Sequence, residues 1–423
     1  MKASIPAGTG EKMQFIVHPF NDNTIRFVLR YPGRLESDVL REATLALASS
    51  VEVLHASFTA DSLRARWQIN SLRAEDCFSC VRVQGDPAEA ALQLALASIA
   101  ADAPAQLRCI LVQGSRDCAL AVLISHLCAD GVDGKYLLRK LCEAYTMLAQ
   151  TGSCESLSVK NGSRAAEQVY SSLNRADRLR LLKDPRSGVH SAFPFPTPDP
   201  GRPVVLHRTL SAGEMADARG RAHAEGATVN DLLLTACYHA FAQVAGLDPQ
   251  SPISIMCMMD LRRHCPGGDS QGLCNLTGAL TTSLPCGPCS TFDETLRTIA
   301  AQTRRSKEDP LAGLYGMPLL HGAARKLPMG LLLAAASHLY GSMSVGLTNV
   351  GALDSASLRM DDSVPQAIWF GGPVKQKPGV QLSAVSLDGA CTLCIWGCAA
   401  PADIPLLQRF LDRTADLAQL CAL

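Results

Sequence analysis

The chain has 423 residues, of which 47% are apolar and 18% are charged. This composition is typical of a folded globular protein and excludes a disordered one. The 39 Lys and Arg residues balance the 39 Asp and Glu residues, which argues against a dedicated nucleic-acid binder because such proteins normally carry a basic excess. Since domains usually have roughly 100–200 residues, the length allows two domains or one large one.

Seventeen cysteines are present, an odd number in a long chain. Secreted disulfide scaffolds are short and follow a leader, and residues 1–15 contain no apolar segment of signal-peptide length. We therefore expect free thiols, a reducing compartment and a cytoplasmic location. The most apolar segment, residues 329–339, has about half of the ~20 residues that a membrane span needs. It predicts a buried helix and no membrane span.

The first part of the chain predicts alternating strands and helices. Apolar and polar residues alternate over residues 25–31, as in a strand with one buried face. Ser37 is expected to cap the helix that follows. The remaining elements predicted here are a helix at 87–101, strands at 107–113 and 118–126, a loop at 127–134 and a helix at 135–149.

Residues 150–203 differ in character, because they contain glycine–serine turns and five prolines between positions 194 and 203. They predict a linker with one charged helix at 165–183. A second folded unit follows, with Ser211 capping one helix and Thr228 or Asn230 capping the next. Its predicted elements are strands at 204–210, 253–259, 276–283, 343–349, 367–370, 381–387 and 391–398, and helices at 211–224, 231–245 and 405–420. Neither a dinucleotide-binding nor a P-loop glycine fingerprint is present.

One stretch has the residue types of a catalytic site: Ser125-His126-Leu127-Cys128-Ala129-Asp130-Gly131. His126 comes directly after an apolar strand, and imidazole can accept and return a proton near neutral pH. Asp130 needs a partner if it is buried, and arginine is the natural one. Gly131 permits a close backbone approach. A lone histidine before an Asp-Gly turn can also be purely structural.

The stretch resembles the HHxxxDG motif of the condensation-domain and CoA-dependent acyltransferase superfamily. Further segments resemble other parts of that superfamily in the same order along the chain. They are residues 33–58, residues 226–241 (GATVNDLLLTACYHAF), Asp260-Leu261-Arg262-Arg263 with Gly272-Leu273-Cys274-Asn275, residues 346–351 (GLTNVG) and residues 379–389 (GVQLSAVSLDG). Together they cover nearly the whole chain.

The resemblance implies a mixed α/β fold of two chloramphenicol-acetyltransferase-like subdomains in a V, with an active-site tunnel at their interface. The N-terminal subdomain would cover residues 1–150 and the C-terminal one residues 204–423, with the linker or crossover 151–203 between them. Proteins of this fold commonly act as monomers, so we expect a monomer.

The resemblance also implies roles for individual residues. His126 would be the general base, and Asp130 would pair with Arg262 to support the active-site loop. Gly131 would let that loop approach the substrate. Ser125 stands where the family usually has its first histidine, which weakens a peptide-condensation reading relative to simpler acyl transfer.

The negative charge on the attacked carbonyl needs a hydrogen-bond donor. Candidates are backbone N–H groups around Asp130 and Gly131, or the side chains of Asn275 and Asn349. Hydrogen bonding at strand ends or turns is an equal alternative for both asparagines. His264 could line the tunnel.

The implied activity is transfer of an acyl group from a thioester donor to a hydroxyl or amine acceptor. The donor would be acyl-coenzyme A or a phosphopantetheine-linked acyl group on an acyl or peptidyl carrier protein, and no tightly bound cofactor or metal is expected. Two alternatives remain open: a freestanding nonribosomal-peptide condensation enzyme that forms an amide, and a non-catalytic module that binds carrier proteins. We expect no nucleic-acid partner.

Several other motifs have structural explanations. Cys286-Gly287-Pro288-Cys289 copies a redox tetrad, but a helix is expected to start only near Thr291. The pairs Cys77/Cys80 and Cys391/Cys394 lack the spacing of a zinc finger. Cys128 is expected to pack rather than to react, and His239 and His338 to lie in or beside the core. The basic runs at 175–186 and 304–307 could bind coenzyme A phosphates or an acidic carrier protein, but can also be solvated helix faces.

Overall fold

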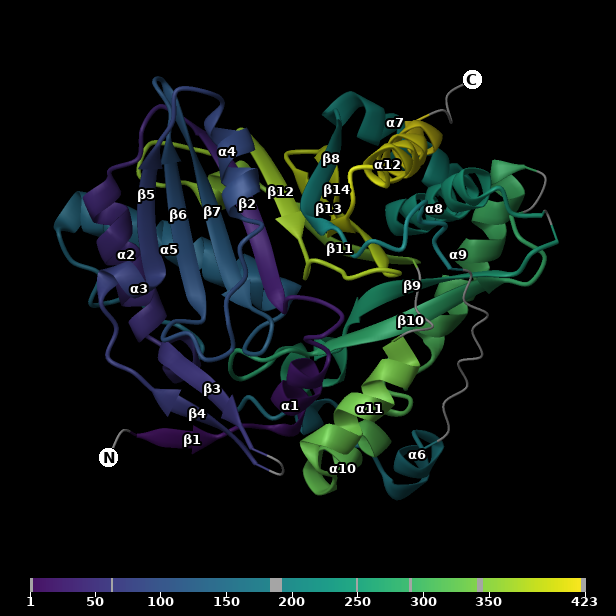
Figure 1. Cartoon of the computed structure of the whole chain (residues 1–423), viewed down its shortest axis with the longest axis horizontal. Coiled ribbons are helices and arrows are strands. Elements are labelled where there is room, and N and C mark those ends of the chain that lie inside the picture. Colours follow the sequence, from purple (N-terminus) through teal and green to yellow (C-terminus); the bar gives the residue numbers. More distant parts are fainter. Residues whose placement is uncertain are drawn as a thin grey trace.

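In the computed structural model, residues 3–61, 64–182, 192–248, 250–288, 291–340 and 345–419 are described. Over these ranges the chain is a mixed α/β protein with three sheets. Figure 1 shows the five-stranded sheet and its helices in the left half of the view and the six-stranded sheet and its helices in the right half. Each half has its own large buried apolar cluster.

The five-stranded sheet has the order β12-β2-β7-β6-β5. Its strands are β2 (Thr24–Pro32), β5 (Phe78–Arg82), β6 (Leu107–Gln113), β7 (Asp117–Ser125) and β12 (Ala367–Gly371). The predicted strands at 25–31, 107–113, 118–126 and 367–370 are thus confirmed to within one residue. Nearly every residue of β2 and β7 is buried, because the helices at 37–49 and 131–151 cover one face of the sheet. The helix at 87–94 and residues from the C-terminal half, such as Trp396, cover the other face.

Helices α2 (Ser37–Ser49), α3 (Ala74–Cys77), α4 (Pro87–Leu94) and α5 (Gly131–Thr151) accompany this sheet. The expected cap at Ser37 is wrong by one residue, since Glu36 holds the N-cap position. Helix α4 ends seven residues before the predicted 101. Helix α5 begins four residues earlier than predicted, because Asp130 accepts hydrogen bonds from the first turn and caps it.

A small sheet at the edge of this half was not predicted. It consists of β1 (Ser4–Pro6), β4 (Ala65–Ile69) and β3 (Ala56–Ala60), in that order. Helix α1 (Thr9–Ile16) follows β1 and lies between the small sheet and helix α11 in Figure 1. Because α1 has a weakly apolar sequence, its position depends on packing against both halves of the chain.

The six-stranded sheet has the order β10-β9-β11-β13-β14-β8. Its strands are β8 (Arg202–Leu210), β9 (Ile253–Asp260), β10 (Thr277–Leu284), β11 (Val345–Leu353), β13 (Val380–Leu387) and β14 (Ala390–Ala399). All six predicted strands are therefore present. Residues 343 and 344 of the predicted 343–349 strand lie outside the described residues.

Helices cover one face of this sheet (Figure 1). They are α7 (Ala212–Ala224), α8 (Val229–Ala245), α9 (Phe292–Glu308) and α12 (Ile404–Gln419). Ser211 caps α7, and Thr228 rather than Asn230 caps α8, each in a capping box. Gly246 ends α8 with φ of 57°, a conformation that glycine adopts without strain.

Strand β12 connects the two large sheets. It pairs antiparallel with β2, so a C-terminal segment completes the N-terminal sheet. The Phe370 carbonyl also accepts hydrogen bonds from Trp396 Nε1 at 3.1 Å and Ser383 Oγ at 2.8 Å, which lie on β14 and β13. The two halves are therefore joined by backbone pairing as well as by side-chain packing.

The predicted single helix at 165–183 is wrong. The structure has the short 3₁₀ helix η2 (Ala166–Tyr170) and helix α6 (Arg175–Arg180), separated by a turn, and Asn174 caps α6. Residues 183–191 lie outside the described part. The other 3₁₀ helices are η1 (Glu52–His55), η3 (Arg262–His264), η4 (Pro266–Gly268) and η5 (Ser355–Leu358).

The predicted buried helix at 329–339 is a helix but is only partly buried. Helix α11 (Met329–Tyr340) buries Met329, Leu332 and Ala336 and exposes Leu331. Its neighbour α10 (Met317–Lys326) was not predicted. No helix in the described ranges is long and apolar enough to cross a membrane.

Candidate active site

His126 is fixed at the end of β7 by backbone hydrogen bonds on both sides. Ser125 pairs with Thr24 in the sheet and its N–H donates to Gln106 O at 2.8 Å. The His126 N–H donates to Asn23 O at 2.7 Å. Asn23 has φ of 51°, a left-handed conformation that asparagine tolerates better than most residues. The imidazole thus starts from a backbone position that the core holds rigid.

The His126 ring is oriented by the loop that follows it. Its Nδ1 lies 2.8 Å from the carbonyl oxygen of Ala129. Because a carbonyl can only accept a hydrogen bond, Nδ1 must carry the proton in the neutral ring. Nε2 then keeps its lone pair, which is the form that a general base requires.

Electrostatics favour the neutral form of this half-buried ring. Burial lowers the pKa of His126, and the positive charge of Lys375 acts in the same direction. The Ala129 carbonyl and the Asp130 carboxylate oppose this shift. Burial also lowers the pKa of Lys375 to about 8. His126 is consequently unprotonated at neutral pH and available to accept a proton.

Asp130 and Arg262 form a buried ion pair across the two halves. Asp130 Oδ2 accepts from Arg262 Nη1 at 2.8 Å and from the Leu276 N–H at 2.9 Å. The two side chains are only 2% and 3% exposed. Asp130 Oδ1 accepts from the N–H groups of Val132 and Asp133. One carboxylate therefore caps α5 and attaches the C-terminal half to the His126 loop.

A second carboxylate, Asp133, shares the same guanidinium. Its Oδ1 lies 3.0 Å from Arg262 Nη2, and its Oδ2 accepts from the Cys274 N–H at 2.8 Å. Burial and the nearby Asp130 raise the pKa of Asp133 to about 7, although Arg262 opposes this. For Arg262 itself, burial favours loss of charge, but the carboxylates of Asp130 and Asp133 outweigh it and raise the pKa.

Gly131 allows the two halves to approach closely. A Cβ at this position would lie 2.9 Å from Val350 Cγ1 and 3.7 Å from Phe370 Cζ. Val350 belongs to β11, and its carbonyl accepts a hydrogen bond from Lys135 Nζ on α5. The glycine therefore permits contact between the start of α5 and β11 beside the His126 loop.

Asn275 is linked to His126 through two intervening side chains. Its Nδ2 donates to Gln14 Oε1 at 3.1 Å, and Gln14 Nε2 donates to Asn23 Oδ1 at 2.6 Å. Asn23 holds the His126 backbone. Asn275 Oδ1 accepts from the Thr277 N–H at 3.1 Å. Asn275 thus ties the C-terminal half to the strand segment beneath the histidine.

The other predicted site residues have local structural contacts. Asn349 Oδ1 accepts from the Gly351 N–H at 2.8 Å, next to an irregularity in β11. Ser125 is buried, and its Oγ accepts from the Leu127 N–H at 3.4 Å. The His264 ring bonds to the Ala312 carbonyl at 3.0 Å, which directs that ring toward the segment before α10.

Most of the described cysteines are buried packing residues, whereas Cys80 and Cys286 are exposed. Burial raises the pKa of Cys128 to about 12, and its Sγ donates to Ser125 O; a thiol in this state is a poor nucleophile. Cys286 is exposed and precedes the N-terminus of α9 by six residues, so it lacks the helix N-terminus of a redox site. Cys289 lies outside the described residues, as does the side chain of His338. His239 is half-buried and bonds Thr295 Oγ1.

Within the described ranges, no group of three or more His, Cys, Asp or Glu side chains is arranged to hold a metal ion. Four residues of the site were not predicted: Asn23, Asp133, Gln14 and Lys375. A second acidic residue in the first turn of α5 could have drawn attention to Asp133. Gln14 and Lys375 come from segments distant in sequence from His126, and no local pattern distinguishes them.

Comparison with solved structures identifies the fold. The chain superposes on polyketide synthase associated protein 5 from Mycobacterium tuberculosis with a TM-score of 0.69 and 16% identity, covering 98% of this chain and 99% of that one. The first condensation domain of the CDA synthetase superposes with a TM-score of 0.69 and 14% identity, covering 100% of this chain and 97% of that one. Trichothecene 15-O-acetyltransferase from Fusarium sporotrichioides superposes with a TM-score of 0.69 and 12% identity, covering 99% of this chain and 95% of that one.

At these identities the similarity establishes the fold. No family model and no curated protein sequence matches the chain. The full-length coverage in both directions means that the similarity includes both halves of the molecule. The chain therefore has the two-subdomain fold of these solved structures, which is the fold that the sequence resemblance predicted.

Proposed function

We propose that the protein is an acyltransferase that uses His126 to move an acyl group from a thioester to a hydroxyl or amine. The observation that carries this proposal is the 2.8 Å contact of His126 Nδ1 with the Ala129 carbonyl. It leaves Nε2 unprotonated on a ring whose pKa is lowered by burial. The solved structures with this fold include a protein named as an acetyltransferase and several named as condensation domains.

The proposed reaction has two proton transfers on one nitrogen. His126 Nε2 removes the proton from the acceptor, whose oxygen or nitrogen attacks the thioester carbonyl carbon. The tetrahedral oxyanion then collapses, the carbon–sulfur bond breaks, and the thiolate takes the proton back from Nε2. The products are an ester or amide and a free thiol. General base catalysis of this kind typically contributes ~10²–10⁴-fold.

The surrounding residues position the base rather than react. The Asp130–Arg262 pair holds the loop whose Ala129 carbonyl orients the ring. Asn23 holds the His126 backbone and is itself held by Gln14. The oxyanion donor is proposed to be a backbone N–H near Asp130 and Gly131, because the side-chain amides of Asn275 and Asn349 already donate to Gln14 and Asn230.

A thiol-release assay tests this function. Purified wild type and His126→Ala are supplied with acyl-coenzyme A and acyl-carrier donors, each with alcohol and amine acceptors. We expect the variant to lose ~10²–10⁴-fold in turnover, while His18→Ala, a histidine stacked on Phe15 at the surface, retains activity. Equal turnover by His126→Ala and wild type would overturn the assignment. Amide formation with carrier-bound acceptors alone would indicate a condensation enzyme.

A further inference from the structure

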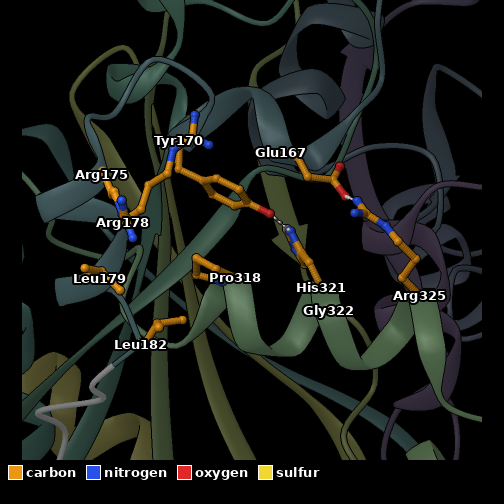
Figure 2. A pocket seen from close by; sticks show the side chains of 10 residues that line it. All are labelled: Glu167, Tyr170, Arg175, Arg178, Leu179, Leu182, Pro318, His321, Gly322 and Arg325. Atoms are coloured by element: carbon orange, nitrogen blue, oxygen red, sulfur yellow. Dashed lines mark hydrogen bonds and ion pairs between the residues drawn. The ribbon is translucent and has the colours of Figure 1, made fainter.

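A cavity lies away from His126, between the linker and α10. It has a volume of about 360 Å³ and is lined by residues of η2, α6 and α10. Figure 2 shows Tyr170 and His321 pointing toward each other across it, with Arg175 and Arg178 at one end and Arg325 at the other. The proposed reaction uses none of these side chains.

The inner wall of the cavity is polar but neutral. His321 is 5% exposed, and burial lowers its pKa, so the ring is uncharged at neutral pH. Its Nδ1 lies 2.7 Å from the Tyr170 hydroxyl, whose pKa burial raises to about 12. Glu167 is matched by Arg325 Nη2 at 2.8 Å and accepts from Thr9 Oγ1 at 2.6 Å. The one carboxylate of the cavity is therefore already compensated.

The two remaining arginines are not compensated. Arg178 donates to the carbonyl oxygens of Leu173 and Ser171, which orient its guanidinium without cancelling its charge. In the part of the chain that the structure describes, neither Arg175 nor Arg178 forms an ion pair with a carboxylate. In a chain of zero net charge, two excess positive charges at one mouth form a local anion-attracting site.

The same mouth has an apolar wall. Leu179 is 57% exposed and Leu182 is 43% exposed, and Pro318 completes the lining on the α10 side. Large exposed leucines beside guanidinium groups suit a ligand with an anionic head and a less polar body. The volume falls within the range of small-molecule sites, and guanidinium forks match phosphate oxygens in geometry and charge.

We propose that this cavity binds the phosphate end of a phosphopantetheine-bearing donor. The inference rests on the proposed function, since it names where that donor's phosphate is held. The long pantetheine arm separates phosphate from thioester, so the phosphate must bind away from His126. Helix α1 lies between the two places: Thr9 contacts Glu167 at the cavity, and Gln14 contacts Asn23 beneath His126.

Equilibrium binding to the full chain tests the proposal without requiring turnover. Calorimetric titration compares 4′-phosphopantetheine, coenzyme A and pantetheine, which lacks the phosphate. We expect both phosphorylated probes to bind at least about tenfold more tightly than pantetheine, because charge-assisted hydrogen bonds are stronger than neutral ones. Equal affinities of pantetheine and phosphopantetheine, or no binding of any probe, would overturn the proposal.

Variants locate the site. Arg175→Gln/Arg178→Gln should lose at least about tenfold in affinity for phosphopantetheine. Arg41→Gln/Arg297→Gln removes two exposed, ion-paired arginines elsewhere and should bind as wild type does. Arg175→Glu alone serves if the double variant is unstable, since no hydrogen bond of the Arg175 side chain is seen among the described residues. Unchanged affinity in both cavity variants would contradict the assignment.

Two further comparisons separate the possible sources of the phosphate and the two proposals. Tighter Arg175-dependent binding of a phosphopantetheinylated carrier protein than of coenzyme A indicates a carrier-borne donor, and the reverse indicates coenzyme A. His126→Ala should bind phosphopantetheine as wild type does. If the titration shows no preference for phosphorylated probes while thiol release still depends on His126, only the phosphate site is refuted. If phosphopantetheine binds as expected while thiol release does not depend on His126, only the proposed function is refuted.

Discussion

Asp130 Oδ2 and Arg262 Nη1 lie 2.8 Å apart although 132 residues separate them in the sequence. Asp130 also caps α5 and follows directly on the loop that orients His126. Arg262 follows β9 of the other half and also reaches Asp260, Ser270 and the Cys274 carbonyl. This one ion pair therefore links the position of the C-terminal half to the orientation of the His126 ring.

Removing the Arg262 guanidinium should greatly lower the free energy of unfolding. Arg262→Ala leaves the carboxylates of Asp130 and Asp133 buried together without a cation, and loss of one partner of a buried pair typically costs about 3–5 kcal/mol. Urea denaturation measures the free energy of unfolding. Arg41→Ala, which breaks the exposed pair with Asp38, should cost no more than about 1 kcal/mol. If both variants lost a similar, small amount of unfolding free energy, the buried cluster would stabilise the fold no more than an exposed ion pair does.

Asp133 should make stability depend on pH. Because burial raises its pKa in the folded state to about 7, the folded protein holds a proton that the unfolded chain has already lost. The stabilisation from that proton is fully present below the unfolded pKa of about 4 and disappears as pH rises through about 7. Between pH 5 and pH 8, the urea midpoint of wild type should therefore fall more than that of Asp133→Asn.

The control for this comparison is Asp38→Asn, an exposed carboxylate on α2. Its urea midpoints should follow those of wild type at both pH values. The urea midpoints of wild type and Asp133→Asn could also differ by the same amount at pH 5 and pH 8. That result would show that Asp133 does not hold a proton in the folded state.

Lys375 should set the acid limit of activity. Its charge contributes to the lowered pKa of His126, so Lys375→Met should raise that pKa. Since the base works only when unprotonated, the acid limb of the kcat/KM profile should move to higher pH, with the plateau above it unchanged. Lys140→Met, which removes a half-buried lysine paired with Glu143 on α5, should leave the limb in place. A shift toward lower pH would refute this role of Lys375.

Gly131 should tolerate no side chain while Val350 is present. The new Cβ of Gly131→Ala would lie 2.9 Å from Val350 Cγ1, and overpacking of this kind typically costs about 1–3 kcal/mol. Adding Val350→Ala should recover part of the loss in unfolding free energy. Gly85→Ala is the matched control, because its Cβ would meet nothing within 4 Å. Simple additivity of the Gly131 and Val350 effects would rule out the steric contact.

Most strands of the two large sheets were predictable because burial leaves a short-range pattern in the sequence, whereas β5 and the small sheet were missed. Segments 107–113 and 253–259 are apolar runs of strand length, and the structure has β6 and β9 there to within one residue. Helices with weak local patterns were missed or misread, as with α1 and the broken helix at 165–183. Their ends depend on contacts such as Thr9 with Glu167, which no local window contains.

By itself, the sequence determined the mixed α/β character, most of the strands, and a histidine placed after an apolar strand with an Asp-Gly pair behind it. Tertiary structure alone decided which groups surround that histidine. Asp133 shares Arg262, Gln14 lies beneath Asn23, and Lys375 is near enough to affect His126. Hydrogen-bond geometry and desolvation act through space over a few ångströms, so segments from positions 14 to 375 meet at one site that no linear pattern records.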